Sequence, residues 1–181
     1  MKYAAFFKGI NVGGRNKVKM EELRNLLDGL GFGSVKSYIQ SGNAVFSSDV
    51  SQESLSGLIS SEFEKRFGFA SAVVIRSGLQ LAEIASCKPF GEEAVGEATL
   101  HNPDVEHCYV YLSETLLDRK EIEKAAVNGD GDLIHLKERE IYLLCRGSIR
   151  DSKAAEGFAK LKTPLTARNM KTIDRVLNML G

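Results

Sequence analysis

The order of hydrophobic patterns in the first 76 residues constrains the fold more than any other feature of this sequence. Short apolar runs, which predict strands, and apolar stripes at helical spacing follow one another in the order β-α-β-β-α-β. This order is typical of a ferredoxin-like fold. The Ser41-Gly42 pair between the second and third runs suits a tight two-residue hairpin. The expected strands are Tyr3–Lys8, Ser34–Gln40, Asn43–Ser47 and Ala72–Arg76, and the expected helices span residues 20–30 and 51–67.

The second half of the chain repeats this order in part. After a short helix that ends before Pro89, residues 90–104 contain Gly, Glu, Asn and Pro without clear periodicity, and we interpret them as a linker. A final helix, with the stripe Met170, Ile173, Leu177 and Leu180, stands where a fourth strand would belong. Between the linker and this final helix we expect strand Glu106–Leu112, helix Thr115–Val127 with Asn128-Gly129 as its stop, strands Leu133–Lys137 and Glu140–Arg146, and a helix over residues 151–161.

We therefore expect an α+β protein with two ferredoxin-like halves, the second degenerate and carrying an extra C-terminal helix. The expected division places the first half and its short helix at residues 1–89, a linker at 90–104 and the second half at 105–181.

Composition limits the classes of function. The 181 residues carry 24 Lys plus Arg against 24 Asp plus Glu, so any attraction to phosphate must come from a local patch. The N-terminal apolar run is too short for a signal peptide, and no stretch approaches the length of a membrane span. Three widely spaced cysteines without a C-x-x-C pair suit reduced thiols in a cytoplasmic protein.

Two polar segments are expected to meet at one edge of the first sheet. A β-α-β crossover makes its two strands parallel, so the loop after the first strand and the turn after the second emerge together. This brings residues 9–17 beside residues 40–43. Glycines in the loop allow close backbone approach, and its amides and cations would form an anion cradle. The alternative is a tight, solvated loop without a ligand.

These residues also resemble a known family. The runs Lys8-Gly-Ile-Asn-Val-Gly-Gly14, Met20-Glu-Glu-Leu-Arg24 and Tyr38-Ile-Gln-Ser-Gly-Asn43 resemble the bacterial family called domain of unknown function 1697. The segments Arg146–Lys153 and Thr166–Thr172 look like its later motifs, although Met170 stands where an aromatic residue is more usual. The resemblance implies two ferredoxin-like halves and no known activity. The functional surface that it implies consists of Gly9, Asn11, Gly13, Gly14, Gln40, Ser41, Asn43, Lys153, Arg168, Asn169 and Thr172.

Several other site types find little support. The spacing of Gly9 and Gly14 approaches that of a P-loop, but Arg15 replaces the lysine and Asn16 the magnesium-binding hydroxyl. The third strand lacks the aromatic pattern on which RNA bases stack. Adjacent His107 and Cys108 point to opposite faces of a strand, so no metal site is expected.

The last forty residues are locally basic. Most of these cations are expected to coat solvated helix faces, whereas Lys153, Arg168 and Asn169 match motifs of the family. Arg168 and Asn169 at the start of the last helix would aim a guanidinium and free amides at an anion, and the alternative is that Asn169 simply caps that helix.

The resulting hypothesis is a protein that binds a phosphorylated small molecule or a nucleic-acid backbone. The expected ligand-binding residues are those implied by the resemblance together with Arg15 and Lys17, and no cofactor or metal is expected. Two alternatives stay open: a small transferase or hydrolase acting on a phosphorylated substrate, and a structural or protein-interaction module. No membrane partner is expected, and monomer and homodimer both remain open.

Overall fold

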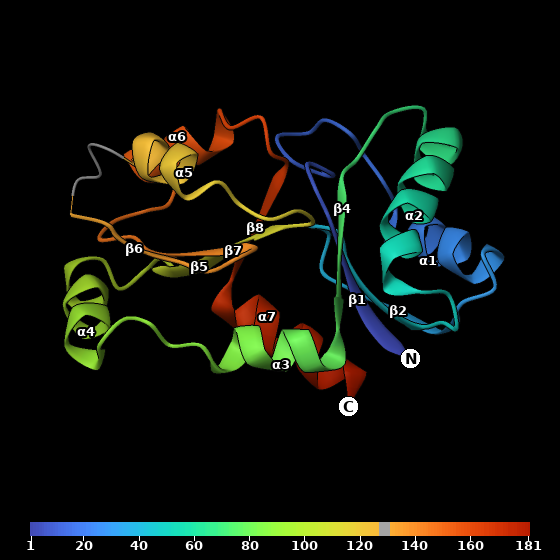
Figure 1. Ribbon diagram of the computed structural model, residues 1–181, viewed down its shortest axis with the longest axis horizontal. Coiled ribbons are helices and arrows are strands. Elements are labelled where there is room, and N and C mark those ends of the chain that lie inside the picture. Colours follow the sequence, from blue (N-terminus) through green and yellow to red (C-terminus); the bar gives the residue numbers. More distant parts are fainter. Residues whose placement is uncertain (127–130) are drawn as a thin grey trace. The chain divides into compact units, whose positions relative to one another are not determined.

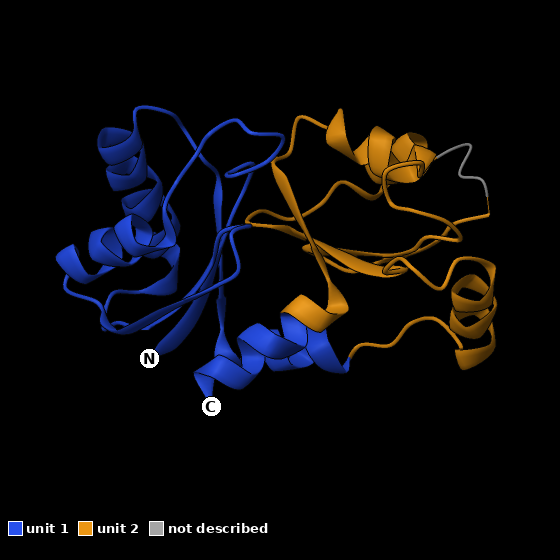
Figure 2. Cartoon of the chain, turned by 180° about the vertical axis from the view of Figure 1, so that it is seen from behind, with its two compact units in different colours: residues 1–86, 173–181 blue, residues 87–172 orange. Residues whose placement is uncertain are grey.

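The computed structural model describes residues 1–126 and 131–181. The chain forms two compact units. Unit 1 comprises Met1–Ser86 and Ile173–Gly181, and unit 2 comprises Cys87–Thr172 (Figure 2). The last nine residues therefore return to the unit in which the chain begins, whereas the sequence assigned them to the second half. The predicted domain limits at 1–89, 90–104 and 105–181 stay a prediction.

Unit 1 contains an antiparallel sheet in the order β2-β3-β1-β4. The central strand β1 pairs with β3 on one side and with β4 on the other, and both neighbours run antiparallel to it. Because β3 is also antiparallel to β2, strands β1 and β2 run parallel. This is the ferredoxin-like arrangement that the sequence predicted. The elements are β1 Lys2–Phe7, α1 Met20–Gly29, β2 Gly33–Tyr38, β3 Asn43–Ser47, α2 Gln52–Phe67, β4 Val73–Ser77 and α3 Gly78–Ser86.

The core of unit 1 lies between the sheet and the helices α1 and α2, which cover the same face of it (Figure 1). Side chains alternate across a strand, so Tyr3, Ala5 and Phe7 enter this core together. Leu23 from α1 and Phe63 from α2 meet them and are fully buried. The period-3.6 stripes of the sequence therefore contain every buried residue of both helices, although Leu58 of the predicted α2 stripe is exposed.

Unit 2 repeats this arrangement in the sheet order β6-β7-β5-β8. Helices α5 and α6 cover one face of the sheet, and α4 lies on the other side (Figure 1). The elements are α4 Glu92–His101, β5 Cys108–Ser113, α5 Arg119–Ala126, β6 Leu133–Leu136, β7 Glu140–Leu144, α6 Lys153–Ala159 and β8 Leu165–Asn169, followed by α7 Met170–Leu180.

The two halves are more alike than the sequence indicated. A fourth strand, β8, is present, so the second half is not degenerate at this point, and α7 follows it directly as α3 follows β4. The likeness extends to single residues. Arg76 lies opposite Ala4, the third residue of β1, and Arg168 lies opposite Val110, the third residue of β5. Both arginines are buried, and each donates from Nη1 to the carbonyl of the preceding residue.

Three further expectations need correction. Residues 90–104, which we interpreted as a linker without clear periodicity, contain the helix α4 at Glu92–His101. The helix expected from Thr115 begins only at Arg119, and its expected end and stop, residues 127–129, lie outside the described residues. The connection between β2 and β3 comprises four residues, 39–42, and not two.

Candidate functional site

The structure brings the two polar segments together at one end of the sheet of unit 1. The amide of Phe7 donates to the carbonyl of Gly42 at 2.8 Å, and Asn11 Nδ2 donates to the carbonyl of Gln40 at 2.8 Å. These bonds join the loop after β1 to the connection after β2. The parallel direction of β1 and β2 explains this meeting.

Asn11 holds the glycine loop (residues 9–17) in its conformation. Its Nδ2 also donates to the carbonyl of Val18 at 2.9 Å, and its Oδ1 accepts from the amide of Val18 at 2.8 Å. The side chain therefore bridges both ends of the loop and the neighbouring connection. This is a positioning role, and it leaves Asn11 only one acceptor site for a ligand.

The loop is anchored by apolar residues and open between them. Ile10 and Val18 are buried in the core of unit 1, whereas residues 12–17 are exposed. Gly9, Gly13 and Gly14 have φ values of 69°, 58° and 76°, in the left-handed region that glycine adopts without strain. The predicted conformational need for glycine is thus present at all three positions.

The connection after β2 is shaped by close contact and by strain. A Cβ atom added to Gly42 would lie 2.6 Å from Ile10 Cδ1 and 2.9 Å from Phe7 Cβ, so only glycine fits there. Ile39 has a φ of 47°, which is unusual for a β-branched residue. This conformation accompanies the four-residue connection, in which the carbonyl of Gln40 accepts from Asn11.

Asn43 and Ser41 serve the turn itself. Asn43 is fully buried, and its Nδ2 donates to the carbonyl of Tyr38 and to Ser41 Oγ at 3.1 and 3.0 Å. Asn16, a neighbour of the predicted site, similarly donates to the carbonyl of Gly9. These amides stabilise the backbone that surrounds the site.

A depression of about 740 Å³ lies where the loop, the connection and the start of α1 meet. We call it the loop pocket. Val18 and Met20 also line it but are almost completely buried, and the other lining residues are Gly14 and polar or charged residues. Arg15 is exposed and is not part of the lining. The lining residues are Asn11, Gly14, Lys17, Val18, Lys19, Met20, Glu21, Glu22 and Gln40.

The charged side chains that line the loop pocket form no hydrogen bonds or ion pairs within the described residues. Among residues 1–126 and 131–181, the structure gives Lys17 and Lys19 no hydrogen-bond or ion-pair partner through their side chains, and the same is true of Glu21 and Glu22. Helix α1 also begins without a side-chain cap, since Lys19 occupies the N-cap position. Free donors and acceptors of both signs therefore face the same depression.

Glu21 and Glu22 were missed as candidate site residues. The sequence signal was available, because the first turn of the predicted helix directly follows the glycine loop. They lie in the Met20–Arg24 run that resembles the family, but they were not among the expected ligand-binding residues. Their carboxylates line the loop pocket because the helix starts at the pocket wall.

The predicted residues of the second half lie in unit 2. Lys153 is the exposed first residue of α6. Arg168 does not open the last helix; it is buried in β8, where its Nη1 donates to Thr166 Oγ1 at 3.1 Å. Burial lowers the pKa of the Arg168 guanidinium to about 10. Asn169 Oδ1 accepts from the amide of Thr172 at 2.8 Å and thereby caps α7.

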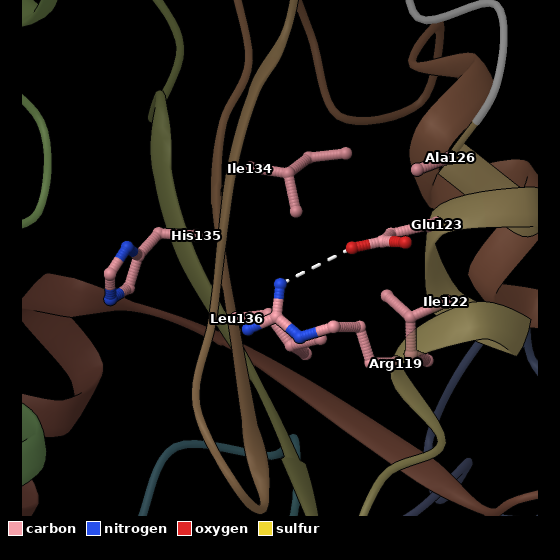
Figure 3. A pocket seen from close by; sticks show the side chains of 7 residues that line it. All are labelled: Arg119, Ile122, Glu123, Ala126, Ile134, His135 and Leu136. Atoms are coloured by element: carbon pink, nitrogen blue, oxygen red, sulfur yellow. Dashed lines mark hydrogen bonds and ion pairs between the residues drawn. The ribbon is translucent and has the colours of Figure 1, made fainter.

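A second depression, of about 420 Å³, lies between α5 and β6 in unit 2 (Figure 3). Its inner surface is aliphatic, from Ile122, Ile134 and Leu136. Arg119 and Glu123 pair with each other at 3.2 Å, whereas His135 points away from α5. In contrast to the loop pocket, its nearest charged groups are already paired.

The comparisons with known proteins agree with the architecture. The family described as protein of unknown function (DUF1697) matches residues 1–142. The chain belongs to this family. The resemblance drawn from the glycine loop and the Tyr38–Asn43 run is thus confirmed.

One solved structure that the chain resembles is the conserved bacterial protein SP0830 from Streptococcus pneumoniae. The two are 26% identical with a TM-score of 0.75, over 99% of this chain and 98% of the other. A search of curated proteins found no match. Within residues 1–126 and 131–181, no helix has the length and apolar character needed to cross a membrane.

Proposed function

We propose that this DUF1697 protein binds a small phosphorylated molecule in the loop pocket. The observation that carries the proposal is the convergence of Lys17, Lys19 and the uncapped start of α1 on one depression. Backbone amides at a helix start and nearby ammonium groups are the donors that phosphate binding uses most often. A volume of about 740 Å³ falls in the range of small-molecule sites.

A comparison between the two halves supports a special role for the loop. The connection from β1 to α1 comprises residues 8–19, whereas the equivalent connection from β5 to α5 comprises only residues 114–118. Both connections leave the central strand of the same kind of sheet. The shorter connection satisfies the fold in unit 2, so the additional residues in unit 1 are not required by the topology.

The signs of the charges favour a small molecule over a nucleic acid. Glu21 and Glu22 line the same depression as the two lysines. A polyanion would bring further phosphates near these carboxylates, and like charges repel. The whole chain has no net positive charge to offset this.

The enzyme alternative gains one feature that the sequence analysis did not provide. Glu22 is half-buried and lines the loop pocket, so a carboxylate that could act as an acid or base stands beside the proposed phosphate position. We place this possibility second, because a carboxylate alone identifies no reaction.

The test is isothermal titration at low salt with inorganic phosphate, ribose 5-phosphate, AMP and a short single-stranded RNA. We expect the small phosphorylated molecules to bind and Lys17→Gln/Lys19→Gln to weaken them at least tenfold. Lys36→Gln, an exposed lysine on β2 outside the pocket, is the matched control and should leave the affinity unchanged. Equal affinity in the double variant would reject the proposal, and so would binding of the RNA alone.

A further inference from the structure

The loop pocket presents two kinds of charged group that a bare phosphate would not use together. Lys17 and Lys19 supply cations, and Glu21 and Glu22 supply carboxylates. The cations and the start of α1 account for a phosphate. The carboxylates need a different part of the ligand.

The carboxylates are not used by the protein itself. Surface ion pairs form elsewhere in this chain, such as Lys65 with Glu62 and Lys160 with Glu156, each at 2.6 Å. Within the described residues no such pair engages Glu21 or Glu22, although lysines stand two to five positions away in the sequence. Both carboxylates therefore keep their full capacity to accept hydrogen bonds.

Gln40 adds a neutral polar group from the other segment. Its backbone carbonyl is engaged by Asn11, whereas its side-chain amide has no partner among the residues described. The pocket thus combines ionic acceptors and an amide that both donates and accepts. Hydroxyl groups match this set, since each one donates to a carboxylate and accepts from an amide.

Resting on the proposed function, we propose that the ligand of the loop pocket is a phosphorylated sugar. Its phosphate binds Lys17, Lys19 and the amides at the start of α1. Its hydroxyls donate to Glu21 and Glu22 and exchange hydrogen bonds with Gln40.

The experiment compares methyl phosphate, ribose 5-phosphate and ribose by isothermal titration. Methyl phosphate reports the phosphate subsite alone, and ribose reports the hydroxyl subsite alone. We expect ribose 5-phosphate to bind at least tenfold more tightly than methyl phosphate. In Glu21→Gln/Glu22→Gln most of this preference should vanish, because a carboxylate accepts a stronger hydrogen bond than an amide does. Methyl phosphate should bind the variant as well as it binds the wild type, or better.

Glu53→Gln is the matched control, because Glu53 stands in the first turn of α2, outside the loop pocket. It should keep the wild-type preference. Equal affinity of methyl phosphate and ribose 5-phosphate for the wild type would overturn the sugar inference and leave phosphate binding intact. A preference that persists in the double Glu variant would overturn it as well. Binding of ribose without methyl phosphate would instead reject the proposed function and retain the hydroxyl subsite.

Discussion

Asn11 uses three of the four hydrogen-bonding positions of its side chain on the backbone of unit 1. It also has a φ of 55°, a conformation that asparagine tolerates better than most residues. Its place in the family motif therefore has a structural cause that is independent of any ligand. An asparagine in a glycine-rich loop is easily interpreted as a ligand-binding residue. Here its side chain instead binds the backbone of the loop and of the neighbouring connection.

The first prediction concerns this residue. Asn11→Ala should lower the free energy of unfolding by about 2–4 kcal/mol, because three hydrogen bonds of about 1 kcal/mol each are lost and alanine disfavours positive φ. Urea denaturation followed by circular dichroism measures the change. The matched variant Asn25→Ala, at an exposed position of α1, should stay within about 0.5 kcal/mol of the wild type. Equal stability of the two variants would contradict the bridging role.

The second prediction concerns pH. Burial, together with the negative charge of Asp132, raises the pKa of the Cys145 thiol to about 12. An unfolded thiol ionises near pH 8.5, so the folded state holds a proton that the unfolded state loses above this pH. The resulting stabilisation is complete below about pH 8.5 and is lost as the pH rises toward 12.

The measurement compares unfolding of the wild type and of Cys145→Ala between pH 8 and pH 10.5. The wild type should lose stability more steeply, with a difference that approaches about 1.4 kcal/mol per pH unit for one proton. The absolute stability of the variant is not the readout, since losing a buried side chain has its own cost. Parallel curves would show that this thiol does not retain its proton.

At the scale of elements, the two halves end in the same way: β4 is followed by a capped helix α3, and β8 is followed by a capped helix α7. Ser77 Oγ accepts from the amide of Gln80, and Gln80 Oε1 accepts from the amide of Ser77, which makes a capping box at α3. Asn169 caps α7 through Thr172 in the equivalent place. Both caps directly follow a buried arginine, Arg76 or Arg168. The motif at residues 166–172 therefore encodes a strand end and a helix start.

The third prediction separates capping from ligand binding at Asn169. Asn169→Ala should reduce the free energy of unfolding by about 1 kcal/mol, whereas Asn169→Ser should recover most of the loss, because serine is also a good N-cap. Urea denaturation of both variants tests this. If alanine and serine are equally harmful, the cap does not explain the residue, and the predicted ligand role gains weight.

The elements that the sequence predicted well carry a clear apolar pattern. β1 is an apolar run after Lys2, and the buried residues of α1 and α2 fall within their predicted stripes, although Leu58 of the α2 stripe is exposed. β8 and α4 were missed for opposite reasons. β8 has the sequence Leu-Thr-Ala-Arg-Asn, in which a buried arginine and threonine conceal a strand. α4 buries only Ala98, so its sequence carries no readable stripe.

The sequence could predict which segments meet at the candidate site, because this follows from the topology of the sheet. Parallel β1 and β2 bring the loop after β1 and the connection after β2 to the same end of the sheet, whatever their side chains are. The side-chain partners were not predictable, because they depend on local geometry. The bridging role of Asn11 needs the carbonyl of Val18 within 2.9 Å, and the carboxylates of the pocket depend on the residue at which α1 begins.

At the scale of the whole molecule, the chain contains the same arrangement of elements twice, and the first copy has the longer connection after its central strand. Each half has the order β-α-β-β-α-β-α, ending in α3 or α7. The connection that leaves the central strand is longer in the first half, and this is where the loop pocket lies. Both halves have the same kind of sheet, and the longer connection of the first half supplies Asn11, Lys17 and Lys19 to the loop pocket.

The end of the chain belongs to the unit in which the chain begins. Residues 173–181 belong to unit 1, and Lys2 Nζ donates to the carbonyls of Leu180 and Gly181 at 2.7 and 2.6 Å. Ile173, Val176 and Leu180 form the buried face of α7, at helical spacing. Complete burial of an aliphatic side chain stabilises a fold by about 1.5–3 kcal/mol. The C-terminal helix is therefore expected to contribute substantially to the stability of unit 1.

The fourth prediction follows from this arrangement. Ile173→Ala/Val176→Ala/Leu180→Ala should increase amide hydrogen exchange in β1, far away in sequence, as unit 1 loses part of its buried surface. The matched control Asp174→Ala/Arg175→Ala/Asn178→Ala changes three exposed residues of the same helix to the same amino acid. It should leave exchange in β1 unchanged, since alanine favours the helix and no buried contact is lost. Exchange measured by mass spectrometry distinguishes the two variants. Equal protection of β1 in both would mean that α7 does not stabilise the strand at which the chain begins.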